Sequence, residues 1–108
     1  MAHEYACLQL HMEAGTEKPL ERILYAVTSY MDSIGMIPCG EDTATRTVCF
    51  APAASGWMVY DDCADRLDLP SIDGLGRCLT RKIRTRAIGV LVSQNGLMLR
   101  LYADGRLR

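Results

Sequence analysis

Five cysteines are the residues of this chain best suited to chemistry, as nucleophiles, redox pairs or metal ligands. No two of them form the C-x-x-C pair that structural zinc sites and redox motifs usually contain. Their number is odd, whereas a secreted disulfide framework is expected to use an even number. We therefore expect reduced thiols, most of them buried as small apolar side chains. The five are Cys7, Cys39, Cys49, Cys63 and Cys78.

Cys78 is the best candidate nucleophile among them. Arg77 precedes it, and a positive neighbour favours the reactive thiolate. Cys63 follows two aspartates, whose charges disfavour that form. A catalytic cysteine also needs a histidine base, and only His3 and His11 are present, both near the N-terminus. A small thiol-dependent enzyme or redox protein is therefore an alternative function, set against a structural role for Cys78.

Two segments carry part of the residue pattern of a ligand-binding loop. Residues 61–68 include four aspartates but lack the D-x-D-x-D-G-x₅-E spacing of a calcium loop. Residues 74–76 read Gly-Leu-Gly, without the third glycine or the G-K-[ST] ending of phosphate-binding loops. We therefore expect no metal and no cofactor, and we interpret the glycines as sites of close backbone approach.

A basic segment is the more informative charge pattern. Five cations within ten residues exceed what the C-terminal dipole of one helix needs, so the surplus could bind phosphates. Against this, the sequence pI is about 6.1, and the chain lacks the aromatic signature of RNA-reading domains. Nucleic-acid binding is thus an alternative to a solvated or partner-facing patch. The five are Arg77, Arg81, Lys82, Arg84 and Arg86.

The net charge of −1 hides a strong division along the chain. Residues 1–76 hold 4 Lys/Arg against 12 Asp/Glu, a net of −8, and residues 77–108 hold 8 against 1, a net of +7. Such asymmetry favours an electrostatic partner, which includes a second copy of the same chain.

The sequence carries no pattern for membrane insertion or export. No stretch approaches the roughly 20 uncharged apolar residues that span a bilayer. Residues 1–4, Met-Ala-His-Glu, lack the positive and apolar regions of a secretion signal. We therefore expect a cytoplasmic protein without membrane contact.

The elements that position these residues follow from hydrophobic periodicity. Residues 4–12 alternate as a half-buried strand does. A helix is expected next, with Thr16 as its N-cap and Gly35 just beyond its end, where a left-handed residue is favoured. Its apolar positions recur at steps of three and four and predict one buried stripe. They are Leu20, Ile23, Leu24, Val27, Met31 and Ile34.

The middle of the chain predicts a hairpin and a second helix. Residues 45–51 and 57–60 are rich in β-forming residues, and residues 52–56 form the loop between them. The second helix starts near residues 69–71, where Asp68 can accept hydrogen bonds from the first amides. Its apolar positions are Ile72, Leu75, Leu79 and Ile83.

The last third predicts a second hairpin. Residues 87–92 are apolar on both faces, as in a central strand. Asn95-Gly96 is a strong two-residue turn signal, and residues 97–102 alternate after it. Asp104-Gly105 is a further turn signal.

This alternation also predicts an exposed sheet face. With the leucines at 97, 99 and 101 against the helices, the residues between them point outward. Aromatic residues, Met and Arg are enriched at protein interfaces, so we expect this outer face to bind a partner. The candidate interface residues are Trp57, Tyr60, Met98, Arg100 and Tyr102.

The chain is therefore expected to be one α+β domain over residues 1–108. Its element order is β-α-β-β-α-β-β, which fits a two-layer sandwich of the split βαβ or ferredoxin-like kind, with two helices on one face of a mainly antiparallel sheet. Our main hypothesis for function is a non-enzymatic interaction or regulatory module that forms a homo-oligomer or binds another protein.

Overall fold

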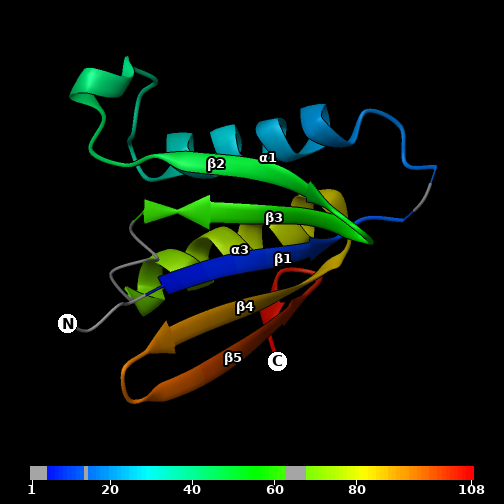
Figure 1. Cartoon of the computed structure of the whole chain (residues 1–108). Helices are drawn as coiled ribbons and strands as arrows, with labels where there is room; N and C mark the ends of the chain where they lie inside the picture. Colours follow the sequence, from blue (N-terminus) through cyan, green and yellow to red (C-terminus); the bar gives the residue numbers. More distant parts are fainter. Residues whose placement is uncertain (1–4, 14, 63–67) are drawn as a thin grey trace.

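The computed structural model describes residues 5–13, 15–62 and 68–108, and over these residues the chain is an α+β protein. Two helices pack on a six-stranded antiparallel sheet in the part described (Figure 1). This confirms the expected class and layer arrangement. The elements are β1 (Tyr5–His11), α1 (Pro19–Ser33), the short 3₁₀ helix η1 (Glu41–Thr43), β2 (Val48–Ala53), β3 (Gly56–Asp61), α3 (Leu69–Ile83), β4 (Arg86–Ser93), β5 (Gly96–Ala103) and β6 (Arg106–Leu107).

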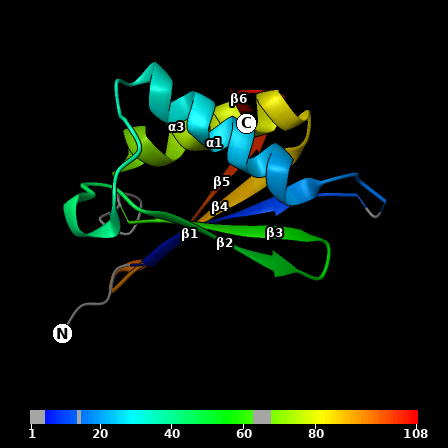
Figure 2. The ribbon, with the colours of Figure 1, turned by 90° about the horizontal axis from the view of Figure 1, so that it is seen from above.

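The sheet has the strand order β2-β3-β1-β4-β5-β6, and neighbouring strands run antiparallel. Both helices lie on the same side of it, so its opposite side is not covered by a helix (Figure 2). We call that side the open face. The two edges are β2, which contains Pro52, and β6, which is two residues long. Proline is tolerated at an edge because no ladder hydrogen bond is required on its outer side.

Both expected turns are present and depend on positive φ angles. Gly96 has a φ of +145° in the turn between β4 and β5. Asp104 and Gly105 have φ angles of 51° and 84° between β5 and β6. Glycine, aspartate and asparagine reach this region at low cost, which is why these pairs specify tight hairpins.

Helix α1 begins later than its sequence predicts. Thr16 is not the N-cap, because its hydroxyl donates to the Glu13 carbonyl at 2.7 Å. The cap position is Lys18, in a left-handed conformation, and Pro19 opens the helix. The reason is steric: proline suits a first helical position and keeps the residue before it out of the helical region. The expected end is confirmed, since Gly35 has a φ of +80° just after the helix.

The buried stripe of α1 is also narrower than expected. Ile23, Ala26 and Val27 are buried, whereas Leu20 and Leu24 are 48% and 53% exposed. The cause is that α1 packs mainly against α3, so only the face directed at α3 is covered.

Helix α3 lies closest to the sheet and is capped as expected. The Asp68 side chain accepts hydrogen bonds from the Ser71 hydroxyl at 2.9 Å and, more weakly, from the Ser71 amide at 3.4 Å. Gly74 lets α1 approach, because a Cβ there would lie 2.6 Å from the Tyr30 hydroxyl. Gly74 therefore makes room for a side chain of α1, whereas the sequence predicted a close approach of backbone.

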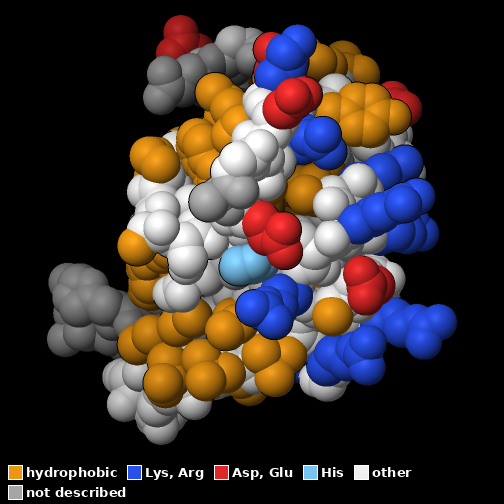
Figure 3. Space-filling model, turned by 90° about the vertical axis from the view of Figure 1, so that its right-hand side faces the viewer, with side chains coloured by type: hydrophobic (Ala, Val, Ile, Leu, Met, Phe, Trp, Pro, Cys, Tyr) orange, Lys and Arg blue, Asp and Glu red, His pale blue; other side chains and the backbone are white. Residues whose placement is uncertain are grey.

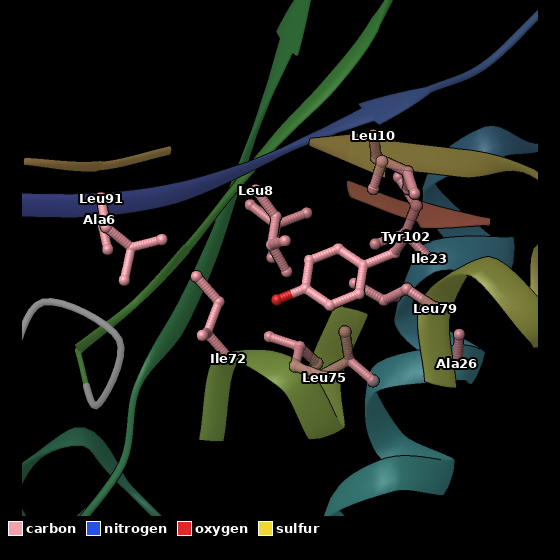
Figure 4. Close-up of a cluster of buried hydrophobic side chains, with 13 residues drawn as sticks. Ala6, Leu8, Leu10, Ile23, Ala26, Ile72, Leu75, Leu79, Leu91 and Tyr102 are labelled. Carbon is pink, nitrogen blue, oxygen red and sulfur yellow. The ribbon is translucent and has the colours of Figure 1, made fainter. Parts of the chain in front are cut away.

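The core lies between the helices and the sheet. A buried ion pair closes it at one end, where the Arg46 guanidinium binds the Asp61 carboxylate and lies 5.3 Å from the centre of the Tyr30 ring. The side chains of Arg46 and Asp61 are 4% and 2% exposed. The fully covered apolar residues are Ala6, Leu8, Leu10, Ile23, Ala26, Val27, Val59, Ile72, Leu75, Leu79, Ala87, Leu91 and Tyr102 (Figure 4).

Neither helix described here has both the length and the apolar character that crossing a bilayer requires.

Candidate functional site

A carboxylate on α3 clamps the end of β5 to the helix layer. The Nε atom of Arg100 donates to Oδ1 of Asp73 at 2.7 Å, and its terminal nitrogen donates to Oδ2 at 2.7 Å. The Tyr102 hydroxyl donates to the same Oδ1, also at 2.7 Å. The Arg100 and Asp73 side chains are only 20% and 19% exposed. This bidentate geometry is the strong form of a charge-assisted pair.

The protonation states of this cluster are those of a structural clamp. Partial burial alone would raise the pKa of Asp73, but the hydrogen bonds from Arg100 and Tyr102 and the charge of Arg100 lower the pKa below its ordinary value. Burial first, and then the bond to Asp73, raise the pKa of Tyr102. At neutral pH the carboxylate is therefore charged and the phenol neutral, and both act as fixed hydrogen-bonding partners.

The ring of Tyr102 fills the gap between α3 and the sheet (Figure 4). It is 1% exposed and lies among leucines and isoleucines of both layers. Gly76 makes room for it, because a Cβ at Gly76 would lie 2.8 Å from a ring carbon. A Cβ at Gly89 would lie 3.4 Å from the ring, which is near ordinary van der Waals contact. Gly76 is therefore required by packing against β5, as the sequence interpretation of residues 74–76 anticipated.

These contacts correct the predicted orientation of β5. Tyr102 is paired with Ala87 and Arg100 with Gly89, on the side of the sheet that α3 covers. Met98 shares that side and is 46% exposed. The prediction that these three side chains point outward is wrong. Since side chains alternate along a strand, a one-residue error in the buried position reverses the whole strand.

The open face instead carries the leucines of β5. Leu97, Leu99 and Leu101 are 65%, 60% and 49% exposed and lie opposite Val92, Val90 and Ile88 of β4. Their exposure is the largest departure from the sequence analysis, which had placed them against the helices.

The two remaining interface candidates lie on opposite sides of the sheet. Trp57 is paired with the buried Leu10 and packs at the border of the core, so it does not face outward. Tyr60 is half-buried on the open face, with its ring centre 6.4 Å from that of Tyr5 on β1. Only Tyr60 of the five candidates therefore belongs to the open face.

The five cations of the basic segment are exposed but do not form one helical face. Arg77, Arg81 and Lys82 lie on α3, whose last turn suits cations because of the helix dipole. The helix ends at Ile83, and Arg84 adopts a left-handed conformation just beyond it. Arg86 is the first residue of β4, and the alternation of side chains along that strand places it on the open face. Lys and Arg side chains nevertheless gather along one end of the molecule (Figure 3).

The described cysteines differ in their surroundings. The sulfur of Cys78 lies 3.6 Å from the Ala26 carbonyl between the helices, with 9% exposure, which fits the structural interpretation. Cys7 is also buried, whereas Cys39 and Cys49 are exposed. Cys63 lies outside the described residues. Within residues 5–13, 15–62 and 68–108, no three His, Cys, Asp or Glu side chains cluster closely enough to hold a metal ion.

Sequence reasoning missed Asp73, although a signal was present. It follows the buried Ile72 by one residue and precedes Gly76 by three, which places a carboxylate on the sheet-facing side of α3. A half-buried carboxylate requires a cation or several donors, and Arg100 was available on an alternating strand.

No known family model, curated protein or solved structure matches this chain. The most distinctive surface is the open face, where large apolar side chains are exposed on adjacent strands.

Proposed function

We propose that this protein is a small non-enzymatic interaction module whose open face binds a second copy of the same chain. The observation that supports the proposal most is the exposed row of Leu97, Leu99 and Leu101 on β5. Burying a leucine side chain fully contributes roughly 1.5–3 kcal/mol. With three leucines at 49–65% exposure, covering this row would contribute on the order of 4 kcal/mol per copy.

The size of the open face fits a modest dimer. Strands β1 to β5 have six to eight residues each, which is about 20–26 Å of length. Five strands spaced about 4.8 Å apart are about 24 Å wide. Two such faces would bury on the order of 1,000 Å² in total, near the lower limit for specific interfaces. We therefore expect a dissociation constant in the micromolar range.

The shape and charge of the face favour a second copy as the occupant. The leucines of β5 form a ridge, while Val90 and Val92 beside them are half-buried and Cys7 on the next strand is 2% exposed. A two-fold symmetric contact sets the ridge of each copy against the recess of the other, since such an interface is self-complementary. Arg86 and Arg108 are charged side chains on this side of the sheet, and both lie at the end where β4 begins, so like charges would not oppose one another across the centre.

The strand order also bears on where the leucine ridge comes from. The order β2-β3-β1-β4 with helices after β1 and β3 is the arrangement expected for a split βαβ unit, to which β5 and β6 add a hairpin. We propose a ferredoxin-like relationship on this basis. In this arrangement the added hairpin supplies the leucine ridge.

The test is the oligomeric state of Leu99→Glu. Sedimentation equilibrium and native mass spectrometry are run on the wild-type protein and the variant from about 1 to 200 µM, a range chosen for the size of interface expected. The variant removes one apolar contact per copy and places two carboxylates in the contact, so the dissociation constant is expected to rise at least about 100-fold.

A matched control comes from α1, on the opposite side of the molecule. Leu24 is 53% exposed, close to the 60% of Leu99, so Leu24→Glu makes the same chemical change outside the proposed contact. The proposal predicts a dimer for wild type and Leu24→Glu and a monomer for Leu99→Glu. A monomeric wild type over this range, or a dimer that only Leu24→Glu disrupts, would show that the open face does not pair with itself.

A further inference from the structure

A hollow of about 420 Å³ lies on the open face where β1 ends. The turn between β2 and β3 borders it on one side, and the start of β4 and the end of β5 border it on the other. Two hydrogen bonds hold these borders in place: the Met12 amide donates to the Ser55 carbonyl at 3.2 Å, and the Thr85 hydroxyl donates to the His11 carbonyl at 2.8 Å. One backbone and one side-chain hydrogen bond therefore fix the borders of the hollow.

The lining of the hollow combines an apolar wall with a few polar groups. Met58, Ile88 and Leu101 supply aliphatic side chains from three strands, and Gln9 and His11 supply groups that can hydrogen bond. Its volume lies within the roughly 300–1,000 Å³ of typical small-molecule sites, which are likewise mostly apolar with a few polar groups. The face of the molecule in Figure 3 shows hydrophobic side chains beside Lys and Arg side chains.

Two guanidinium groups give the hollow its charge. Arg86 and Arg108 line it and are exposed, and within the described part of the chain no carboxylate lies in ion-pair distance of either. The lining includes no Asp, Glu or Cys. A metal cation would therefore be repelled and find no suitable ligands, whereas an anion would be attracted.

We propose that this hollow binds a small organic acid with an aliphatic body. The carboxylate would interact with Arg86 and Arg108, because guanidinium groups bind carboxylates with directed hydrogen bonds. The chain would lie against Met58, Ile88 and Leu101. Among the described residues, neither of the two comparable surfaces offers both halves together: the centre of the open face between β4 and β5 is apolar without cations, and the basic part of α3, on the other side of the sheet, has no comparable hollow.

The probe is octanoate, titrated into ¹⁵N-labelled protein and followed by NMR chemical shifts. Trp57 borders the hollow while its side chain packs at the core on the other side of the sheet, so its backbone amide serves as the reporter. The measurement is made on Leu99→Glu, because Leu99 does not line the hollow and a monomer separates ligand binding from self-association. Octanol and octylammonium, which have the same chain but no negative charge, are the matched ligands.

The expected result is saturable binding of octanoate that Arg86→Gln weakens at least about tenfold, as the loss of a charge-assisted contact implies. Arg84→Gln removes a nearby cation that does not line the hollow and should leave binding unchanged. The inference is overturned if octanol binds as well as octanoate, if the two arginine variants behave alike, or if the shifts miss Trp57. Leu101 and Ile88 belong both to the open face and to the hollow, so the two proposals share part of one surface. Octanoate binding by Leu99→Glu and self-association of the wild type are nevertheless separate readouts, so a failure of one proposal is distinguished from a failure of the other.

Discussion

Asp73→Asn tests whether the clamp between α3 and β5 holds the two layers together. The substitution keeps the size of the side chain but replaces a charged acceptor of three hydrogen bonds. Breaking a buried ion pair by neutralising one partner costs about 3–5 kcal/mol. The pair here is about 20% exposed, and asparagine retains one acceptor oxygen, so we expect a loss of about 2–4 kcal/mol. For a domain of this size that lowers the Tm by roughly 8–16 °C.

The pH dependence of this loss follows from the lowered pKa of Asp73. Burial opposes the shift, but the bonds from Arg100 and Tyr102 outweigh it, so the folded protein holds the charged form more strongly than the unfolded chain does. The stabilisation is therefore fully present above the ordinary carboxyl pKa of about 4 and is lost as the pH falls through the lower folded value. The stability difference between wild type and Asp73→Asn should be largest near pH 7 and shrink below about pH 4.

The assay is urea denaturation followed by circular dichroism, at one protein concentration because the proposed dimerisation would shift apparent stability. Asp68→Asn is the matched control, since Asp68 starts the same helix and asparagine caps a helix about as well as aspartate. We expect its effect to stay within about 0.5 kcal/mol. If Asp73→Asn costs no more than Asp68→Asn, or if its cost does not change with pH, the reasoning about the clamp is wrong.

Two further outcomes follow from packing. Gly76→Ala should destabilise the protein by on the order of 1 kcal/mol in urea denaturation, because the cost of overpacking against the Tyr102 ring, about 1–3 kcal/mol, exceeds the gain in helix propensity of about 1 kcal/mol. In a Tyr102→Leu background the same change should become neutral or stabilising, and an unchanged penalty would contradict the assigned contact. Iodoacetamide should label the exposed Cys49 at least about tenfold faster than the buried Cys78, as peptide mapping by mass spectrometry can measure. Equal rates would mean that the two helices separate readily at Cys78.

Turns and helix ends could be predicted from the sequence wherever one or two residues determine the local backbone conformation. Gly35 and Gly96 need positive φ angles, and Asp68 needs only the amide and hydroxyl of Ser71 three residues on, so each was predicted correctly. The start of α1 was missed because the favourable cap residue Thr16 was given more weight than the steric effect of Pro19.

The orientation of β5 could not be read from the strand itself. The leucines occupy every second position of β5, and Met98, Arg100 and Tyr102 occupy the positions between them, so either set could face the core. Because leucine is the more apolar, the sequence favoured burial of the leucines. The orientation of β5 is decided by Asp73, 27 residues before Arg100, and by Gly76 in α3, which makes room for the Tyr102 ring. Such long-range pairings are invisible to periodicity, which is why the candidate interface was placed on the wrong side of the sheet.

The hollow on the open face was likewise beyond reach of the sequence. Met58, Ile88 and Leu101 are far apart in the chain and are brought together by the strand order β3-β1-β4-β5. The sequence did single out Arg86, as part of a basic segment. The sequence could not show that Arg86 lies on the first position of β4 rather than on the helix, with its side chain on the open face.

The two edges of the sheet limit how copies of this chain can assemble. An edge strand with unpaired amides can accept a strand from another molecule, and repetition of that contact produces open-ended fibres. Here Pro52 interrupts the row of donors on β2, and β6 is only two residues long, so neither edge offers a long template. Contact through the open face has no such repetition, because a two-fold pair consumes both surfaces and leaves none for a third molecule. Under the proposed pairing, the proline on β2 disfavours further association at that edge of the sheet, and growth is expected to stop at two copies.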